Sequence, residues 1–180
     1  VPVSRETEKA KKILEIFRPV YENPKILKVG QNLKYDLTVL ANYGIHLSGP
    51  LFDTMLAHYL IQPELRHNMD YLAEIYLNYK TIHIEELIGP KGRGQKNMGD
   101  LEPKDIYKYA CEDADVTLRL MKPLAEELRK NSLEEVFQNI EMPLMPVLAR
   151  MERNGVVLDT ETLKEVENDF TLRLQTLEKD

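Results

Sequence analysis

Two short clusters in the sequence place a carboxylate beside a group that could assist it. In the first, Asn32 and Asp36 lie four residues apart, and in the second, Tyr109 and Asp113 have the same separation. Residues four apart share one face of a helix, so the members of each pair could act together. An aspartate can hold a divalent cation, and a phenol can orient water bound to that cation. Either pair alone is more often a solvated or capping pair, so the clusters are informative only in combination.

Both clusters are expected to lie on helices that the surrounding sequence defines. A strand is expected at residues 26–29, and Asn32 opens the helix that follows it. Ligands of open α/β sheets bind beyond the carboxyl ends of the strands, so Asp36 is expected at that edge. The second cluster lies on a long helix that begins at Pro103 and runs toward Leu128.

Strands alternate with helices in the first part of the chain, and helical patterns dominate after Asn131. This order predicts an α/β fold followed by the edge of a helical region. Before the long helix, the other expected elements are the end of a strand at Val1–Val3, a helix from Ser4 to about Pro19, a strand that turns helical over Phe52–Ile61, and a helix capped by Asn68 or Asp70 and running through Leu77. After the long helix we expect two more helices. The first has a Ser132–Glu135 capping box and a bend at Pro143 and Pro146, and the second is amphipathic and carries Leu163 to Leu177.

The composition argues against several classes of protein. The 180 residues are 43% hydrophobic and 30% charged, without a signal peptide or an apolar run long enough to span a membrane. The single cysteine, Cys111, excludes an internal disulfide and indicates a cytoplasmic protein. The histidines lack the spacing of a zinc site; they are His46, His58, His67 and His83. A net charge of -6 argues weakly against DNA binding, although carboxylates that hold catalytic cations are an exception.

Six segments together resemble the proofreading exonuclease domain of the bacterial DNA polymerase I family, in the family's order and near its spacing. They are Gly30–Asp36, Phe52–Leu56, Asn68–Ala73, Tyr109–Thr117, Glu141–Leu148 and Arg153–Val156. The resemblance implies a ribonuclease-H-like 3′-5′ exonuclease domain at residues 1–131, lacking its first strands, and the helical start of a polymerase domain at residues 132–180. The implied function is part of a DNA-directed DNA polymerase that also removes nucleotides from DNA 3′ ends for proofreading.

The resemblance assigns a role to individual residues. Asp36 and Asp113 match the carboxylates of the family's second and third motifs, which help to hold two Mg²⁺ (or Mn²⁺) ions. Tyr109 would orient the attacking water, and Asn32 and Tyr35 match residues that line the path of the single-stranded 3′ end. This assignment requires Asp36 and Asp113 to converge from separate helices on one pocket.

The family's first motif, Asp-x-Glu, supplies two further carboxylates and lies upstream of these segments. The match begins inside the family's third strand, so we expect this motif to be cut away, the ions to be absent or partial, and the fragment to be inactive. A literal Asp-x-Glu at Asp159–Glu161 falls after the third motif, and Asp159 is interpreted there as a helix cap. Asp53 is interpreted as structural. Loss of the first strands also predicts an unpaired sheet edge, which invites self-association.

A basic loop at residues 89–96 carries Lys91, Arg93 and Lys96. It predicts a mobile contact to the DNA backbone or, with equal weight, a plain solvated loop. The partners expected of the full protein are a single-stranded DNA 3′ end, a primer-template and nucleotides, with no membrane.

Two other functions remain open. A ribonuclease D-like 3′-5′ exoribonuclease would share the tyrosine, but the segment Glu141–Arg153 resembles the polymerase entry and disfavours it. A non-catalytic DNA-binding or scaffold module would resemble family members that have lost their carboxylates, whereas this sequence retains Asp36, Tyr109 and Asp113.

Overall fold

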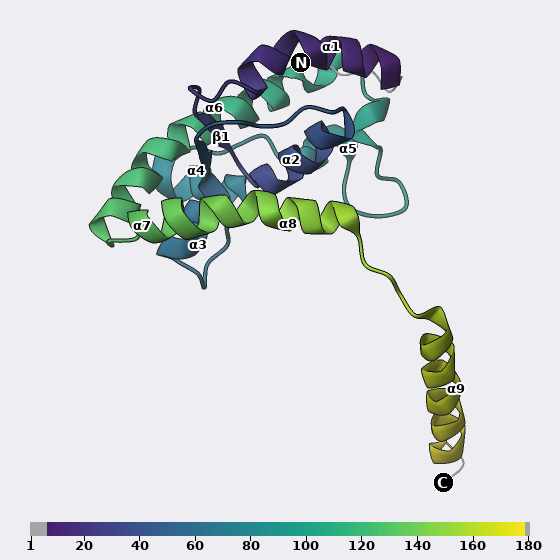
Figure 1. The fold of residues 1–180 in the computed structure, drawn as a ribbon. Coiled ribbons are helices and arrows are strands. Elements are labelled where there is room, and N and C mark those ends of the chain that lie inside the picture. Colours follow the sequence, from purple (N-terminus) through teal and green to yellow (C-terminus); the bar gives the residue numbers. More distant parts are fainter. Residues whose placement is uncertain (1–6, 179–180) are drawn as a thin grey trace. The chain divides into compact units, whose positions relative to one another are not determined.

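A computed structural model describes residues 7–178 of the chain (Figure 1). In chain order the elements are α1 (Thr7–Tyr21), β1 (Lys28–Gly30), α2 (Leu33–Asn42), β2 (Leu51–Asp53), α3 (Thr54–Ile61), α4 (Met69–Leu77), α5 (Ile84–Ile88), the 3-10 helix η1 (Met98–Asp100), α6 (Pro103–Lys130), α7 (Glu134–Val136), the π-helix η2 (Phe137–Glu141), α8 (Met142–Asn154) and α9 (Thr160–Leu177). The fold is α/β and mostly helical, as predicted. The strand expected at Val1–Val3 and the cap expected at Ser4 lie outside the described residues.

The sheet positions the starts of two helices side by side. Within residues 7–178 it consists of β1 and β2, which pair in parallel with Val29 opposite Phe52 and Gly30 opposite Asp53. Parallel strands present their carboxyl ends at the same edge, and here the chain enters α2 shortly after β1 and α3 directly after β2. Both helices therefore begin at one edge of the sheet. Self-association through a free strand edge stays a prediction.

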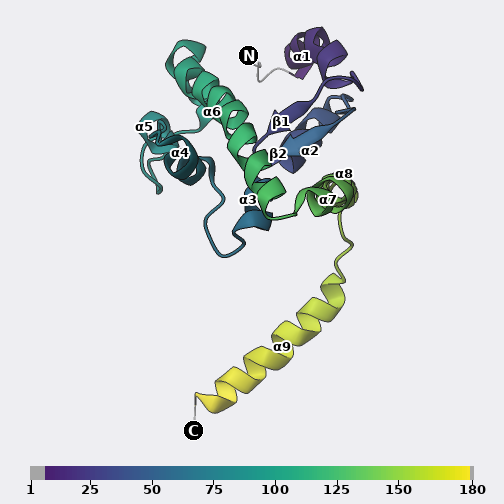
Figure 2. The same cartoon turned by 90° about the vertical axis from the view of Figure 1, so that its left-hand side faces the viewer.

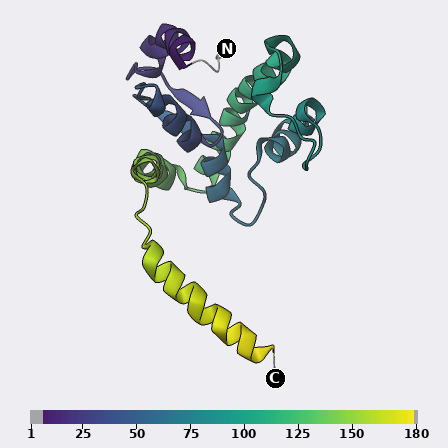
Figure 3. The same cartoon turned by 90° about the vertical axis from the view of Figure 1, so that its right-hand side faces the viewer.

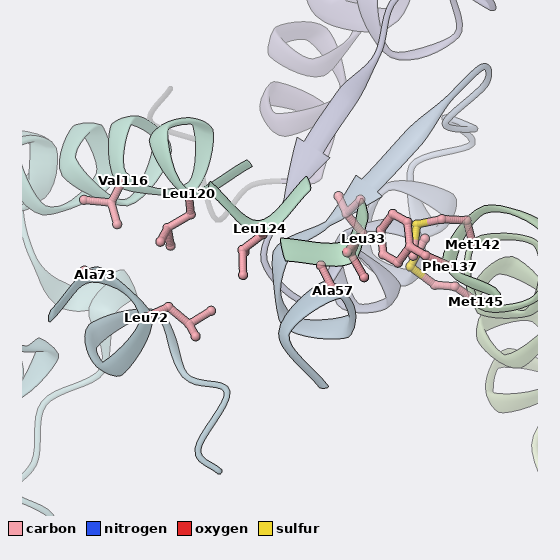
Figure 4. Close-up of a cluster of buried hydrophobic side chains, with 11 residues drawn as sticks. Leu33, Ala57, Leu72, Ala73, Val116, Leu120, Leu124, Phe137, Met142 and Met145 are labelled. Atoms are coloured by element: carbon pink, nitrogen blue, oxygen red, sulfur yellow. The ribbon is translucent and has the colours of Figure 1, made fainter. Parts of the chain in front are cut away.

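The long helix α6 is the center of the packing. It packs against α3, α4 and β1, and Figures 2 and 3 show α4 on one side of it and the sheet on the other. Figure 4 shows Leu72 of α4 facing Leu120 of α6, both fully buried. A second group of buried side chains joins α2 and α3 to the segment after α6; it comprises Leu33, Ala57, Phe137, Met142 and Met145. Burial on both sides of α6 fixes its register relative to the sheet.

Two sequence-based expectations about helix ends are wrong. Helix α1 continues past Pro19 to Tyr21, and Arg18 bridges this last turn through hydrogen bonds to Glu15 (2.7 Å) and Glu22 (2.6 Å). These charged contacts hold the turn despite the missing proline N–H.

The capping box predicted at Ser132 is also wrong, because Ser132 terminates α6 instead of opening the next helix. Its φ of 57° is left-handed, its N–H donates to the Arg129 carbonyl (3.1 Å), and the Leu133 N–H donates to the Leu128 carbonyl (2.8 Å). This pair of bonds is the usual end of a helix that closes on a left-handed residue. The bend predicted at Pro143 and Pro146 stays a prediction.

The chain divides into two compact units, Val1–Arg150 and Met151–Asp180. The first continues beyond residue 131 because Phe137, Met142 and Met145 belong to its core. In the second, α9 is capped by Asp159, whose carboxylate accepts from the N–H groups of Glu161 and Thr162. The cap interpretation of Asp159 is thereby confirmed. In neither unit does the described part of the chain contain a helix with the length and apolarity needed to cross a bilayer.

Candidate exonuclease site

The turn between β1 and α2 is tightly packed and sets the direction in which α2 leaves the sheet. A Cβ placed on Gly30 would lie 2.2 Å from Cδ2 of Leu33, so a larger residue at the end of β1 would force the buried Leu33 side chain to move. Asn32 then takes a left-handed conformation (φ 63°, ψ 52°), and α2 starts at Leu33. Because Leu33 is buried, the first turn of α2 is anchored in the core and Asp36 leaves it close to the sheet edge.

Asp36 of α2 and Asp113 of α6 line one cavity of about 730 Å³. Strand β1 forms part of its wall, and Tyr35, Met69 and Thr117 also line it. The structure thus brings together the two carboxylates that lie far apart in the sequence. A shared cavity is compatible with the sequence-based assignment, which stays a prediction.

The surroundings of Asp113 destabilise the ionised form of its carboxyl group. Its Oδ1 atom is buried and has no hydrogen-bond partner. Burial raises the pKa of Asp113 to about 6, the Tyr109 phenol opposes this rise by hydrogen bonding, and the charges of Glu112 and Asp70 add to it. A buried carboxylate oxygen without a donor is a position that a divalent cation would stabilise.

Tyr109 lies one helical turn before Asp113, and the two side chains interact. Burial, followed by the negative charges of Asp113 and Asp70, raises the pKa of Tyr109 to about 12. The phenol is therefore protonated at neutral pH and acts as a hydrogen-bond donor. That state suits a group that orients water or an anionic oxygen beside Asp113.

Asp36 is exposed overall, yet its carboxyl group also has a raised pKa. Partial burial is the main cause, and the negative charge of Asp53 contributes, whereas the backbone N–H of Asp36 itself opposes the shift. A cation bound at either carboxylate would relieve the unfavourable charge of that group. Across residues 7–178, however, no cluster of three or more histidine, cysteine or acidic residues has a metal-binding arrangement. The two carboxylates alone therefore form only part of an ion site.

Of the other residues predicted to bind nucleic acid, only Tyr35 lines this cavity. Tyr35 lines it and is 67% exposed, which leaves its ring accessible for stacking. Asn32 instead lines a smaller cavity of about 150 Å³ next to Asp53 and Met145. Lys91, Arg93 and Lys96 are exposed on the loop after α5, and none of them lines the cavity of Asp36 and Asp113. The basic loop is thus outside the lining of the carboxylate cavity, and its role in binding DNA stays a prediction.

Asp113→Asn is expected to stabilise the metal-free chain at neutral pH. The folded chain retains the Asp113 proton up to about pH 6, whereas an ordinary aspartate releases it near 3.8. The free energy of unfolding therefore falls as the pH rises from about 3.8 to about 6, and the loss is complete above this interval, where Asp113 is ionised in the folded chain as well. Urea unfolding in the presence of a chelator should show a gain of ~1 kcal/mol at pH 7.5. The gain should shrink toward pH 4.5; an equal gain at both pH values would contradict this assignment of the charge.

Comparison with known proteins identifies the family of this chain. Residues 1–129 match a family model described as 3′-5′ exonuclease. The chain belongs to this 3′-5′ exonuclease family. The match includes Asp36, Tyr109 and Asp113, and it confirms the resemblance that the sequence segments indicated.

Related sequences extend the similarity beyond the family model. The chain is 43% identical over 171 residues to DNA polymerase I of Pseudomonas aeruginosa, covering 93% of this chain and 19% of that protein. It is 37% identical over 169 residues to DNA polymerase I of Borreliella burgdorferi, covering 93% of this chain and 18% of that protein. The chain thus spans about a fifth of the length of these relatives.

A solved structure shows the same fold as this chain. The POL domain of Pol1 from M. smegmatis, in complex with DNA primer-template and dNTP, superposes with a TM-score of 0.69 at 23% identity, covering 92% of this chain and 25% of that chain. At this identity the likeness establishes the fold alone.

Proposed function

We propose that the chain is part of a DNA-directed DNA polymerase and supplies one side of its proofreading 3′-5′ exonuclease site. The observation that carries the proposal is the shared cavity of Asp36 and Asp113 in a chain whose residues 1–129 match the exonuclease family. The similarity to DNA polymerase I over 171 residues continues past residue 129. That extent favours a polymerase over a ribonuclease D-like enzyme, and the retained carboxylates favour a catalytic domain over a scaffold.

The chemistry assigned to the site is hydrolysis of the terminal phosphodiester of a DNA strand. When bound, two Mg²⁺ (or Mn²⁺) ions supply hydroxide near neutral pH and relieve charge on the phosphate and leaving oxygen. Asp113 would hold one ion and Asp36 would help to hold the other through water. The phenol oxygen of Tyr109, held beside Asp113 by their hydrogen bond, would orient the attacking water. The exposed ring of Tyr35 would stack on a base of the single-stranded end.

The remaining carboxylates have to come from the family's Asp-x-Glu motif. Within these 180 residues, Asp36 is the first aspartate. We therefore propose that the domain at residues 1–131 has a ribonuclease-H-like fold in which further strands provide the motif, and that residues 132–180 begin a polymerase domain. The whole protein would act in the cytoplasm on a primer-template and nucleotides.

The chain by itself is expected to show no appreciable exonuclease activity. Two carboxylates bind divalent ions weakly, and the ligand that contacts both ions in the family is not supplied. Labelled single-stranded DNA incubated with the purified chain and Mg²⁺ or Mn²⁺ should stay intact. Digestion that depends on the ion and disappears with Asp113→Asn would contradict this expectation.

A chimera tests the positive part of the proposal. In DNA polymerase I of Pseudomonas aeruginosa, the 171-residue matched segment is replaced by the corresponding residues of this chain. We expect the chimera to shorten labelled single-stranded DNA from its 3′ end in a Mg²⁺-dependent reaction. A chimera that extends a primer but never shortens it would refute the exonuclease assignment.

The loop carrying Lys91, Arg93 and Lys96 is expected to contact the DNA backbone. Replacing all three residues with alanine in the chimera should weaken binding of single-stranded DNA. The slope of the logarithm of the binding constant against the logarithm of the salt concentration should decrease in magnitude by about 2, because each phosphate contact contributes roughly 0.7. Replacing Lys122 and Lys130 with alanine provides a comparison outside the loop. An unchanged salt slope in the loop variant would identify a plain solvated loop.

A further inference from the structure

The first turn of α2 lacks a cap from its own N-cap residue. Asn32 occupies that position in a left-handed conformation, and its side chain makes no capping hydrogen bond. Left-handed geometry is unfavourable for residues other than glycine, although asparagine tolerates it better than most. The exposed N–H groups at the start of α2 therefore need an acceptor from elsewhere in the fold.

Asp53, at the end of the neighbouring strand, supplies this acceptor. Its Oδ2 accepts from the Leu33 N–H (2.6 Å), and its Oδ1 accepts from the Asn32 N–H (3.2 Å). The same carboxylate caps α3 by accepting from the N–H groups of Met55 (2.9 Å) and Leu56 (3.2 Å). Asp53 is 1% exposed. One buried carboxylate thus joins the starts of two helices, where both helix dipoles favour its negative charge.

The next residue strengthens the same junction from the other side. The Thr54 hydroxyl lies 3.1 Å from the Gly30 carbonyl oxygen and also donates to Oε1 of Gln31. The Gln31 side chain in turn donates to the His67 carbonyl (2.6 Å). Because β1 and β2 pair with Gly30 opposite Asp53, residues of β2 and α3 hold the entire turn that leads into α2.

We propose that Asp53 is a positioning residue for the candidate ion site, holding the first turn of α2 so that Asp36 stays at the cavity that Asp113 also lines. The inference rests on the proposed function for the role of Asp36. Asp53 reaches Asp36 through the backbone of Leu33, which lies in the same helical turn. Its carboxylate is fully engaged by four N–H donors, which makes it a support for the site and not an ion ligand.

Asp53→Ser separates this role from ordinary helix capping. A serine oxygen can still cap α3 locally, but the shorter side chain cannot reach the N–H groups of α2. Asp159→Ser is the matched control, since Asp159 caps α9 and makes no such bond to a second helix in the part of the chain that the structure describes. Two nuclear magnetic resonance readouts on the whole chain follow the effect: amide hydrogen exchange, and line broadening by Mn²⁺.

In the unsubstituted chain, Mn²⁺ should broaden the signals of Asp36 and Asp113 together. In Asp53→Ser, amide exchange from Leu33 to Asp36 should accelerate about tenfold or more. The α6 amides should keep their protection, and broadening should persist at Asp113 and decline at Asp36. Asp159→Ser should change neither readout.

The alternatives are distinguishable. Absence of broadening at both carboxylates in the unsubstituted chain would refute the proposed ion site itself. Broadening there that Asp53→Ser leaves unchanged, or unchanged exchange in α2, would refute the role of Asp53 alone. If the α6 amides of Asp53→Ser also lose protection from hydrogen exchange, the isosteric variant Asp53→Asn is measured in the same way. Loss of α6 protection in both variants would show that Asp53 stabilises the whole fold and would overturn the proposal.

Discussion

Asp113→Ala in the chimera is expected to lower the exonuclease rate by about 10³-fold or more while primer extension continues at its original rate. A cation that stabilises charge in a phosphodiester transition state contributes several kcal/mol, and loss of a direct ligand forfeits most of that contribution. Asp113 also holds the Tyr109 phenol beside the site, so its removal disturbs the water-orienting group as well. The measurement is release of the labelled 3′ nucleotide under single-turnover conditions.

Asp115→Ala is the matched control for this prediction. Asp115 lies on the same helix two residues later, but its side chain is 64% exposed and pairs with Arg119 at 3.4 Å. An exposed pair of this kind contributes little. The Asp115→Ala chimera should therefore retain its exonuclease rate within a few-fold. Equal losses in both variants would indicate a general effect of negative charge on α6 and would remove Asp113 from the site.

Leu120→Ala is expected to lower the free energy of unfolding by about 2–5 kcal/mol, the range for a leucine whose loss leaves a cavity in a packed core. Leu120 is fully buried on α6 and faces Leu72 of α4 (Figure 4). The neighbouring Leu118 on the same helix is 58% exposed and provides the control. Urea unfolding followed by circular dichroism should show a large loss for Leu120→Ala and less than about 1 kcal/mol for Leu118→Ala. Similar losses would contradict the packing of α6 between α4 and the sheet.

The elements that the sequence predicted well are those with strong local signals. The amphipathic pattern and Pro103 located α6, and Asn68 and Asp159 marked the starts of α4 and α9. The helix ends at Pro19 and Ser132 were predicted wrongly because distant or neighbouring hydrogen bonds overrode the local preference. Helix α5 was not predicted, since five residues are too few to produce a clear period.

For the candidate site too, sequence predicted the features with local signals and missed those that depend on the fold. Spacing predicted that Asn32 and Asp36 share one helix face, and that Tyr109 and Asp113 share another. The family resemblance then predicted that both pairs belong to one site. Sequence reasoning recognised Asp53 as structural, but not which groups it holds. Two of its four donors, Asn32 and Leu33, lie about 20 residues earlier in the chain. An aspartate between a strand and a helix signals a local cap, whereas a partner on another helix becomes visible only once the strands are paired.

The pairing of Gly30 with Asp53 sets limits on how this protein can change during evolution or engineering. Residues 43–50, which connect α2 to β2, are themselves packed in the fold: Ile45 is 1% exposed, and the Ser48 N–H donates to the Tyr21 carbonyl (3.0 Å). A slip of one residue along β2 would turn Phe52 or Thr54 toward α2 and point the carboxylate to the opposite face of the sheet. A change of length within residues 43–50 is thus expected to disturb this packing, while a single deletion inside β2 would abolish the alignment of both helices.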